Sequence, residues 1–458
     1  MSAGKLPEGW EQIEIGDIAD VISGGTPKSG VAENFAPSGE GVAWLTPADL
    51  SGYKEKYISH GARDLTTLGY SSCSAKLMPK GTILFSSRAP IGYVAIAANE
   101  IATNQGFKSF AFPSDIFPDY AYYFLRNIRH IAEEMGTGTT FKEISGSSAK
   151  TLPFVLVPFA EQKIIAEKLD TLLAQVESTK ARLEQIPQIL KRFRQAVLHV
   201  AVSGKLTEKW RLENATLENS YEWKIQSLSD LGVLARGKSK HRPRNDPRLF
   251  GDKYPFIQTG EVANSSGRIK GANKFYSEFG LSQSKLFPKD TLCITIAANI
   301  ADTAILEIEA CFPDSVVGFI SDRNKSHVSF VKYLIDVNKD NLEAFAPATA
   351  QKNINLKVLN ELKLPIPDIK EQHEIVRRVE QLFAYADTIE KQVNNALARV
   401  NNLTQSILAK AFRGELTVQW RAENPDLISG ENSAAALLEK IKAERAASGG
   451  KKASRKKS

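Results

Sequence analysis

Long apolar runs and cysteine are scarce in this 458-residue sequence, and each shortage excludes a class of protein. A membrane-spanning helix needs about 18 or more consecutive apolar residues, and no such run occurs. The first residues lack the apolar core of a secretory signal, so we expect the chain to stay in the cytoplasm. The three cysteines, Cys73, Cys293 and Cys311, are widely spaced and form no Cys-x-x-Cys pair. Neither a disulfide framework nor a zinc site is therefore expected.

Signatures of catalysis are also missing. There is no Gly-x4-Gly-Lys-Ser/Thr loop to hold a nucleotide, and no Asn-Pro-Pro-aromatic signature of a methyltransferase. The six histidines show no His-x3-His spacing that would suit a metal. Glu361-Leu362-Lys363 has the Glu-x-Lys shape of a nuclease motif, but no Pro-Asp precedes it at a suitable distance, and solvated charges explain it. We expect a non-catalytic chain that holds no cofactor or metal.

The charge balance is basic. The net charge is +7 and the isoelectric point is about 9.0, which favours an anionic partner such as nucleic acid, although many basic proteins bind none. Part of the excess lies in the last eight residues, 451–458, which carry five cations behind Gly449-Gly450. This end is predicted to be a disordered tail.

An internal repeat organises the rest of the chain. The segment 204–211, Gly-Lys-Leu-Thr-Glu-Lys-Trp-Arg, recurs 210 residues later as 414–421, Gly-Glu-Leu-Thr-Val-Gln-Trp-Arg. Glu161-Gln162 recurs as Glu371-Gln372 at the same shift. Such self-similarity indicates a duplicated architecture.

A heptad pattern lies between these anchors. Apolar side chains alternate spacings of four and three residues over 165–197 and again over 375–407, with Thr179 as the exception. A 3.5-residue period predicts a coiled-coil seam, so each segment is expected to form a helix of about 33 residues, or roughly 50 Å. Pro187 predicts a kink or a local break in the first helix. An antiparallel pair would bury both stripes; two unrelated amphipathic helices are the alternative.

The segments before the helices repeat more faintly. Residues 10–24 match 223–237, and 76–82 match 285–291. Short β-rich runs at 82–85 and 291–294 are predicted strands. The predicted fold is therefore α+β: two mixed α/β domains joined by two long antiparallel coiled-coil helices, with a pseudo-two-fold internal repeat. The expected divisions of the chain are domains at 1–150 and 213–360, helical regions at 151–212 and 361–424, and a final helix with a basic tail at 425–458.

The loops of the two halves differ. Residues 24–30 of the first half, Gly-Gly-Thr-Pro-Lys-Ser-Gly, correspond to the basic segment 236–244 of the second, Arg-Gly-Lys-Ser-Lys-His-Arg-Pro-Arg. A shared scaffold with diverged loops is what two separate recognition tasks require.

With these features the sequence resembles the specificity subunit of type I restriction-modification enzymes. The resemblance covers nearly the whole chain and is carried by 157–165 and 365–372 at the helix entrances, by the paired Gly-x-Leu-Thr-x-x-Trp-Arg exits, and by Gly81–Gly92. The lysine-rich tail resembles the enteric subgroup. The second domain departs from the pattern, since Ala297–Ala301 replaces Arg88–Gly92, so the two domains are expected to read different bases.

The resemblance implies a division of labour. The specificity subunit performs no chemistry, and each of its two target-recognition domains reads one half of a split double-stranded DNA target. Two modification subunits would carry S-adenosylmethionine and methylate adenine. Two restriction subunits would use ATP and magnesium to translocate and cut DNA. The helices would set the length of the unread spacer.

Candidate DNA-binding residues follow from side-chain chemistry. Lys and Arg bind phosphates, Arg also reads guanine, and Asn or Gln reads adenine. The expected contacts in the first domain are Lys28, Arg88, Asn104, Gln105, Lys108 and Lys142. Those in the second domain are Arg236, Lys238, Lys240, Arg242, Arg244, Asn299, Gln351 and Lys352. For each residue taken singly, a solvated surface charge is the competing explanation.

Two other functions compete with this hypothesis. One is a duplicated DNA-binding or adaptor protein with a coiled-coil spacer, which would not co-purify with a methyltransferase subunit. The other is a self-sufficient methyltransferase or nuclease, which would bind S-adenosylmethionine as an isolated chain.

Overall fold

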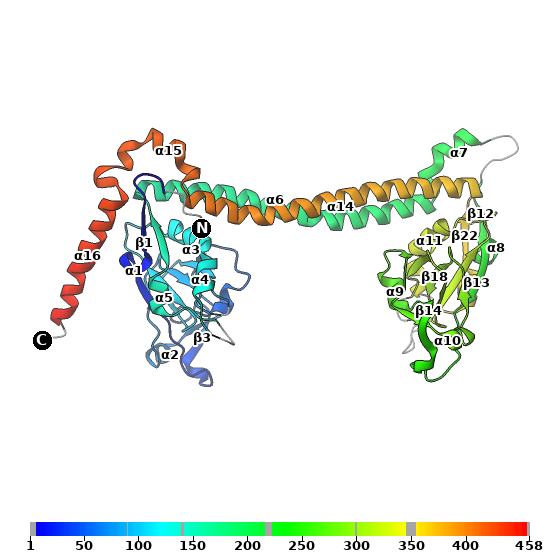
Figure 1. Cartoon of the computed structure of the whole chain (residues 1–458), viewed down its shortest axis with the longest axis horizontal. Helices are drawn as coiled ribbons and strands as arrows, with labels where there is room; N and C mark the ends of the chain where they lie inside the picture. Colours follow the sequence, from blue (N-terminus) through cyan, green and yellow to red (C-terminus); the bar gives the residue numbers. More distant parts are fainter. Residues whose placement is uncertain are drawn as a thin grey trace. The chain divides into compact units, whose positions relative to one another are not determined.

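The computed structural model describes residues 6–88, 90–138, 142–215, 222–297, 300–344 and 354–455. It contains two domains of mixed strand and helix and two long helices, α6 (Phe159–Val202) and α14 (Ile369–Phe412) (Figure 1). We call the described residues of 6–158 domain 1 and those of 222–368 domain 2. The predicted fold class is confirmed.

Domain 1 is built on a five-stranded sheet of order β2-β10-β7-β8-β5. Its strands are β2 (Asp20–Ser23), β10 (Lys108–Ala111), β7 (Ile83–Phe85), β8 (Val94–Ala97) and β5 (Tyr57–Ile58). Three two-stranded sheets pair β1 (Glu11–Glu14) with β11 (Pro153–Leu156), β3 (Phe35–Pro37) with β6 (Arg63–Leu65), and β4 (Trp44–Leu45) with β9 (Ala102–Thr103). The helices are α1 (Ile15–Ile18), α2 (Thr67–Ser71), α3 (Pro118–Asn127), α4 (Arg129–Met135) and α5 (Gly146–Lys150).

Domain 2 repeats this plan with a sheet of order β13-β21-β18-β19-β15. Its strands are β13 (Gly232–Arg236), β21 (Val316–Ser321), β18 (Leu292–Thr295), β19 (Thr303–Leu306) and β15 (Arg268–Ile269). β12 (Lys224–Ser227) pairs with β22 (Lys363–Ile366), as β1 does with β11. A four-stranded sheet holds β16 (Lys274–Tyr276), β14 (Phe250–Phe256), β20 (Ala310–Cys311) and β17 (Leu286–Phe287). The helices are α8 (Leu228–Leu231), α9 (Thr259–Asn264), α10 (Glu278–Ser282), α11 (Val328–Val337), α12 (Lys339–Ala344) and α13 (Leu356–Glu361).

Each main sheet is buried on both faces. In β7, Ile83 and Phe85 join one apolar cluster, and Leu84, which points to the opposite face, joins another. In β18, Leu292 and Cys293 divide between two clusters in the same way. Continuous apolar runs such as Ile83–Phe85 are typical of strands covered on both sides. The predicted strands at 82–85 and 291–294 are therefore confirmed to within one residue.

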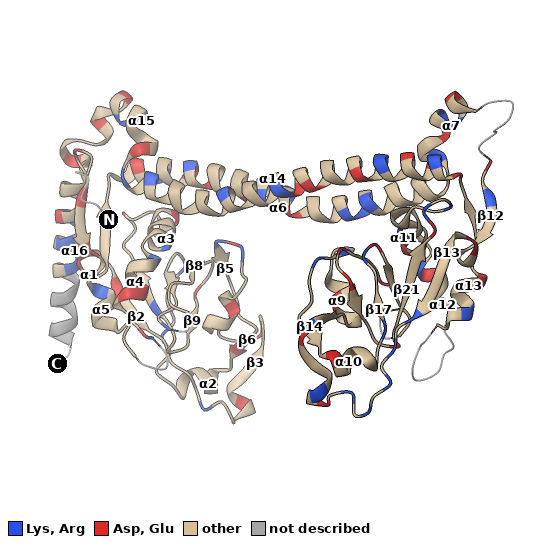
Figure 2. Ribbon diagram, turned by 45° about the vertical axis from the view of Figure 1, so that its right-hand side comes forward, with Lys and Arg blue, Asp and Glu red and all other residues tan. Residues whose placement is uncertain are grey.

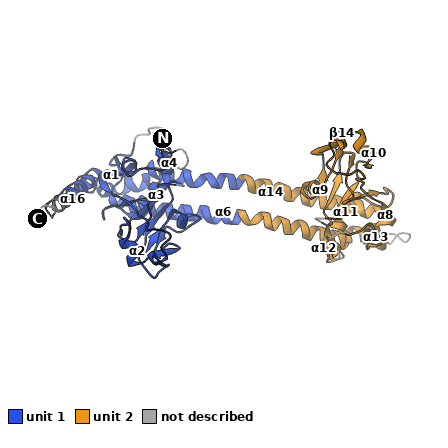
Figure 3. Ribbon diagram, turned by 90° about the horizontal axis from the view of Figure 1, so that it is seen from below, with its two compact units in different colours: residues 1–183, 396–458 blue, residues 184–395 orange. Residues whose placement is uncertain are grey.

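The chain forms two compact units, and both long helices contribute to each (Figure 3). Unit 1 contains residues 1–183 and 396–458, and unit 2 contains residues 184–395. In unit 1, Lys168 Nζ near the start of α6 donates to the backbone oxygen of Leu416, just beyond α14 (2.9 Å). In unit 2, Arg194 late in α6 pairs with Asp387 in the first half of α14 (2.6 Å). The helix segments are thus antiparallel within each unit, as predicted.

The helices are longer than the heptad count predicted. Each has 44 residues, against about 33 expected, because regular turns continue beyond the first and last residues of the apolar stripe. Of the kink or local break expected at Pro187, the break is wrong, since α6 remains helical through this residue. Proline removes one backbone donor, and the buried Leu190 and Val197 hold the following turns in place. Of the predicted stripe, Thr179 and Leu403 are exposed.

A buried carboxylate locks the start of α6 in unit 1. Glu161 is fully buried and accepts hydrogen bonds from Trp10 Nε1 (2.8 Å), Thr417 Oγ1 (2.7 Å) and the Arg421 guanidinium (2.7 Å). Arg421 also donates to the carbonyl of Gly414, whose φ of +78° favours glycine. The residue before β1, the start of one long helix and the segment after the other helix therefore meet at one side chain.

The same arrangement recurs at the start of α14 in unit 2. Glu371 accepts from Trp223 Nε1 (3.1 Å), Thr207 Oγ1 (2.7 Å) and Arg211 (2.8 Å). Arg211 donates to the carbonyl of Gly204, as Arg421 does to that of Gly414. We call these two clusters the glutamate junctions. They explain why Glu-Gln and Gly-x-Leu-Thr-x-x-Trp-Arg repeat together at a shift of 210 residues.

The glutamine of each Glu-Gln pair ties the helix to its own domain. Gln162 accepts from the backbone N–H of Phe117 (2.7 Å), and Gln372 accepts from that of His327 (2.9 Å). Their amide groups donate to the carbonyls of Asp115 (3.4 Å) and Lys325 (3.0 Å) respectively. Asp115 and Lys325 therefore occupy equivalent positions in the two domains.

An ion pair adds a further contact between each domain and its helix. In unit 1, Lys56 bridges Asp119 of α3 and Asp170 of α6. In unit 2, Arg268 of β15 pairs with Glu380 of α14 (3.4 Å). The two units use different residues for this contact, so an ion pair between domain and helix occurs in both units although the residues that form it are not repeated in the sequence.

Among the residues that the structure describes, no helix is long and apolar enough to cross a membrane. The same residues contain no group of three His, Cys, Asp or Glu side chains placed to hold a metal ion. All three cysteines are free thiols.

Candidate nucleic-acid interface

The predicted contacts of domain 1 come mostly from one end of the main sheet. β10 is antiparallel to both β2 and β7, with Lys108 opposite Ser23 and Phe110 opposite Ile83. The exits of β2 and β7 therefore lie beside the entrance of β10. This sheet end collects the loops that carry Lys28, Arg88 and Asn104–Lys108.

Contacts between these loops confirm that they are neighbours. The hydroxyl of Thr26 donates to the side-chain oxygen of Gln105. Arg88 pairs through its backbone with Glu143, and the Glu143 carboxylate accepts from Lys108 Nζ (3.4 Å). Four stretches far apart in sequence thus build one surface.

The predicted residues differ in how far they reach solvent. Lys28, Gln105 and Lys142 are exposed, and Arg88 is half-buried. Asn104 is half-buried and uses its side-chain oxygen to accept from the backbone N–H of Gly106 (2.8 Å). Lys108 is buried beside Glu143, so a phosphate contact would require this pair to open.

One glycine position is required by the packing of this surface. A side chain at Gly24 would place its Cβ 2.1 Å from the backbone oxygen of Asn104. In domain 2 a Cβ at Gly237 would come 2.2 Å from the oxygen of Pro313. The loop after the edge strand must approach the neighbouring backbone closely in both domains, which explains why this glycine matches between the halves.

Domain 2 presents the same sheet end with different chemistry. β13 is antiparallel to β21 with Arg236 opposite Val317, so the basic segment 236–244 leaves β13 at the end equivalent to that of Lys28. Arg236, Lys238, Lys240, Arg242 and Arg244 are all exposed, while Gly237 between them is buried. The segment therefore directs its cations outward.

An aspartate lies among these cations. Asp314 precedes β21, and its carboxylate pairs with Arg244 (3.0 Å), while its backbone oxygen accepts from Arg236 Nε. Arg242 donates to the backbone oxygens of Ser239 (2.6 Å) and His241 (2.8 Å). The basic loop is thus held in a defined conformation by its own arginines.

The far side of the loop is anchored by Asp246. Its carboxylate accepts from Arg248 and lies 2.7 Å from the His241 ring nitrogen. Donation from the Arg248 side chain holds the pKa of Asp246 well below its ordinary value. The loop also packs on the segment after α10, where Ser284 donates to the carbonyl of Lys238 (2.9 Å).

Three predicted contacts of domain 2, Asn299, Gln351 and Lys352, lie outside the residues that the structure describes.

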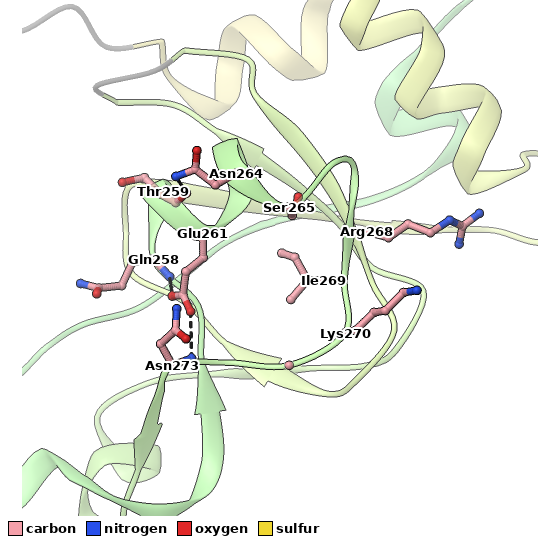
Figure 4. A pocket seen from close by; sticks show the side chains of 11 residues that line it. Gln258, Thr259, Glu261, Asn264, Ser265, Arg268, Ile269, Lys270 and Asn273 are labelled. Carbon is pink, nitrogen blue, oxygen red and sulfur yellow. Dashed lines mark hydrogen bonds between the residues drawn. The ribbon is translucent and has the colours of Figure 1, made fainter. Parts of the chain in front are cut away.

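Domain 2 also carries an open polar cavity of about 570 Å³ beside α9 (Figure 4). Glu261 projects into it and accepts from the backbone N–H groups of Gln258 (2.9 Å) and Asn273 (3.0 Å). Arg268 and Lys270 lie on its rim and point away from it. The Glu261 carboxylate is already bound by two backbone N–H groups of the surrounding loop, so its role is to hold the loop closed. Two cations, Arg268 and Lys270, lie at the edge of the cavity.

Chemically, the sheet end of domain 1 offers cations and amides, and that of domain 2 offers cations; the described residues include no group of His, Cys, Asp or Glu side chains that could hold a metal ion. Basic and acidic residues also alternate along α6 and α14, so the cations are not confined to one element (Figure 2). Sequence reasoning missed Glu143 and Asp314, the acids that pair with the predicted cations. No local pattern marks them, because each pairs with residues at least 35 positions away.

Comparisons with known proteins agree with this architecture. The family model described as the type I restriction modification DNA specificity domain matches residues 7–188 and 221–399. The chain is 42% identical to the EcoKI specificity subunit of Escherichia coli K12 and 40% identical to the StySPI specificity subunit of Salmonella potsdam, over the full length of all three proteins.

A solved structure of an HsdS subunit from Thermoanaerobacter tengcongensis shares the fold. Its TM-score is 0.62 at 16% identity, over 90% of this chain and 99% of that one. The family model covers both domains and most of both long helices, and the full-length relatives carry the same name. This chain therefore belongs to the family of type I restriction-modification DNA specificity subunits.

Proposed function

We propose that each domain reads one block of a split duplex DNA target through the loops at its sheet end. The observation that supports this most directly is the repeated sheet with unlike loops. The same end of the sheet carries Lys28, Arg88 and Gln105 in domain 1 and an arginine-lysine loop with Asp314 in domain 2. Equal scaffolds with unequal hydrogen-bonding groups suit two different base sequences.

The chemistry of modification and restriction belongs, in this proposal, to partner subunits. Two modification subunits would supply S-adenosylmethionine-dependent methylation, and two restriction subunits would supply ATP- and magnesium-dependent translocation and cleavage. The chain would act in the cytoplasm, where the host DNA lies. Its own part is to bind DNA and to place the partners on it.

Salt-dependent DNA binding tests the role of the basic loop. We expect a variant with Lys238, Lys240 and Arg242 changed to alanine to bind duplex DNA more weakly. The slope of log affinity against log salt is negative, and each lost phosphate contact makes it shallower by about 0.9. The loss of three contacts should therefore reduce the magnitude of the slope by up to about 3. The measurement is a titration of the assembled methyltransferase with target and non-target duplexes at several salt concentrations.

Exposed lysines elsewhere in unit 2 provide the control. Lys209, Lys253 and Lys357 have side-chain exposures of 86%, 60% and 77%. Changing these three to alanine removes the same charge without touching the loop, and should leave the slope nearly unchanged. Equal slopes for the loop variant and the wild type would remove the loop from the interface.

A further inference from the structure

The last helix, α16 (Ala434–Arg455), distinguishes the two otherwise repeated units. It packs on domain 1 beside α1 (Figure 1). Its Ala434, Leu437 and Ile441 are buried in the cluster that contains Ile15 and Ile18. We call the surface beneath it, residues 11–20 with Asp115, the α16 seat.

Two ion pairs align α16 on this seat. Lys440 Nζ lies 2.8 Å from the Asp115 carboxylate, and Arg445 donates to Asp20 (3.1 Å) and to the backbone oxygen of Ala19 (3.4 Å). The seat is acidic: Glu11, Glu14, Asp17 and Asp20 are all exposed, and 11–20 contains no cation. A helix that carries Lys440, Lys442 and Arg445 therefore complements it.

Unit 2 contains an equivalent surface, which we call the counterpart seat, residues 224–233 with Lys325. The strand pairing of β12 with β22, the capped helix α8 and the first residues of β13 repeat β1, α1 and β2. The amide of Gln372 fixes Lys325 in the place where that of Gln162 fixes Asp115. The chain carries one α16, and it lies in unit 1.

The counterpart seat has gained exposed apolar side chains and has lost three of the four acids of residues 11–20, and Asp230 is the acid that remains. Ile225 replaces Gln12 and is 66% exposed, and Val233 replaces Asp20 and is 62% exposed. Lys224 replaces Glu11, and Lys325, with a 61% exposed side chain, replaces Asp115. Both ion-pair partners of α16 are thus lost, and one of them has become a cation that would repel Lys440.

Burial differs in the same direction. Leu408 and Phe412 of α14 are 1% and 5% exposed in unit 1, whereas the equivalent Leu198 and Val202 of α6 are only partly buried in unit 2. Trp10 is buried, but Trp223 is only half-buried. Among the described residues, the apolar side chains around the junction are therefore more exposed in unit 2 than in unit 1.

We propose that the counterpart seat is a docking site for an acidic amphipathic helix of a modification subunit. The helix would place an acidic side chain against Lys325, where α16 has Lys440, and an apolar one against Val233, where α16 has Arg445. Charge complementarity keeps α16 on unit 1 and selects a different helix for unit 2. This inference rests on the proposed function, because it takes its partner from the modification complex.

Peptide binding to the full chain tests the chemistry of the seat. One probe is a fluorescent peptide of residues 433–447; the other is the same peptide with Lys440→Glu, Lys442→Glu and Arg445→Leu. At physiological salt the acidic peptide should bind the wild-type chain at least tenfold more tightly in an anisotropy titration. The double variant Val233→Asp/Lys325→Asp, which recreates the acidic seat, should reverse this preference.

Lys253→Asp is the matched control. The side chains of Lys253 and Lys325 are similarly exposed, at 60% and 61%, and each pairs with an acid. Lys253 lies on β14, outside the counterpart seat. The control variant should change neither affinity by more than twofold. Equal binding of both peptides, or an unchanged preference in the double variant, would overturn the proposal. Self-association of the wild-type chain that is lost on removing residues 434–458 would also overturn it, in favour of a second copy.

Assembly with the modification subunit separates this inference from the function on which it rests. The double variant should bind the modification subunit at least tenfold more weakly, with an unchanged thermal melt showing that it folds. If wild type and double variant assemble and methylate equally, the docking site is wrong and the specificity function stands. If the wild-type complex shows no sequence-dependent DNA binding or methylation, the proposed function itself fails.

Discussion

Glu161 and Glu371 are fully buried carboxylates whose hydrogen-bond donors come from separate parts of the chain. Glu161→Gln should destabilise unit 1 by about 3 kcal/mol, because it leaves the Arg421 guanidinium, only 13% exposed, without its countercharge. Urea unfolding followed by tryptophan fluorescence measures the loss. Glu167→Gln, an exposed position on the same helix, should change stability by less than about 0.5 kcal/mol. Equal losses for the two variants would contradict the role of the junction.

Glu374 predicts a pH dependence in unit 2. Donation from Arg377 and Arg378 lowers the pKa of Glu374 from 4.5 to about 2. Arg378 in turn donates to the carbonyl of Leu206 after α6 (2.8 Å). Because the pKa is lower in the folded state, the carboxylate stabilises the fold above pH 4.5, and this stabilisation is lost as the pH falls toward 2.

Thermal melts of wild type and Glu374→Gln test this expectation. The difference in melting temperature should be largest above pH 5 and should shrink between pH 4.5 and 2. A difference that stays constant over this range would show that the charge of Glu374 is not what holds Arg378.

The sequence identified the residues of the glutamate junctions as repeated motifs, but it did not identify their hydrogen-bond partners. Glu-Gln and Gly-x-Leu-Thr-x-x-Trp-Arg were recognisable as repeats, yet nothing in them shows that Glu161 meets Thr417, which is 256 residues away. The acids Glu143 and Asp314 were missed for the same reason. Pairing across such separations depends on the fold, and local patterns do not encode it.

The two long helices lead to a prediction about spacing. Inserting four residues into α6 near Leu183 and four into α14 near Asn395 lengthens each helix by about 6 Å. Such an insertion keeps an apolar stripe nearly in phase. If the helices set the spacer, the preferred gap between the two DNA blocks should grow by one or two base pairs, at about 3.4 Å each. Methylome sequencing of cells that carry the variant measures the gap.

A one-residue insertion in each helix serves as the control. It rotates the following stripe by about 100° and should impair assembly rather than change the spacer. The recognised bases should stay the same in the four-residue variant, since no loop at a sheet end is altered. Methylation confined to the original spacing would show that the helices do not set the distance.

Among the elements, the heptads predicted both helices and their antiparallel pairing. Their ends were underestimated because the first turns, from Phe159 and Ile369, are fixed by the Glu-Gln contacts and not by the stripe. The helix does not break at Pro187 for a related reason, since one missing backbone donor is a small loss beside the packing of a 44-residue helix. Local propensity gave way to tertiary contacts in both cases.

For the whole molecule, the repeated sheets predict that the domains are exchangeable. Replacing residues 11–156 with the corresponding domain of a relative should change only one block of the target. These boundaries leave Trp10 and Glu161, which the junction needs, outside the exchanged segment. Methylome sequencing of the hybrid is the measurement, and a change in both blocks would mean that the domains do not read independently.

The division of the chain into two compact units could not be predicted from the sequence. Sequence similarity separates domains from helices along the chain, whereas the compact units each combine a domain with halves of both helices. Unit 2 is continuous from residue 184 to 395, but unit 1 joins residues 1–183 to 396–458. The two parts of unit 1 are recognised as one unit from contacts in the structure: α6 pairs with α14, and Arg421 pairs with Glu161.

The discontinuity of unit 1 has a consequence for how the protein is made. On the ribosome, domains emerge from the N-terminus onward and commonly fold as they appear. Here every segment of unit 2 has emerged once residue 395 has left the ribosome. At that point Thr417 and Arg421, which bind Glu161 in unit 1, have not yet been released. The half that is begun first is therefore completed last. Until then a nascent chain exposes the apolar surface of domain 1 that Leu437 and Ile441 of α16 later cover, so this surface favours aggregation until α16 has packed on it.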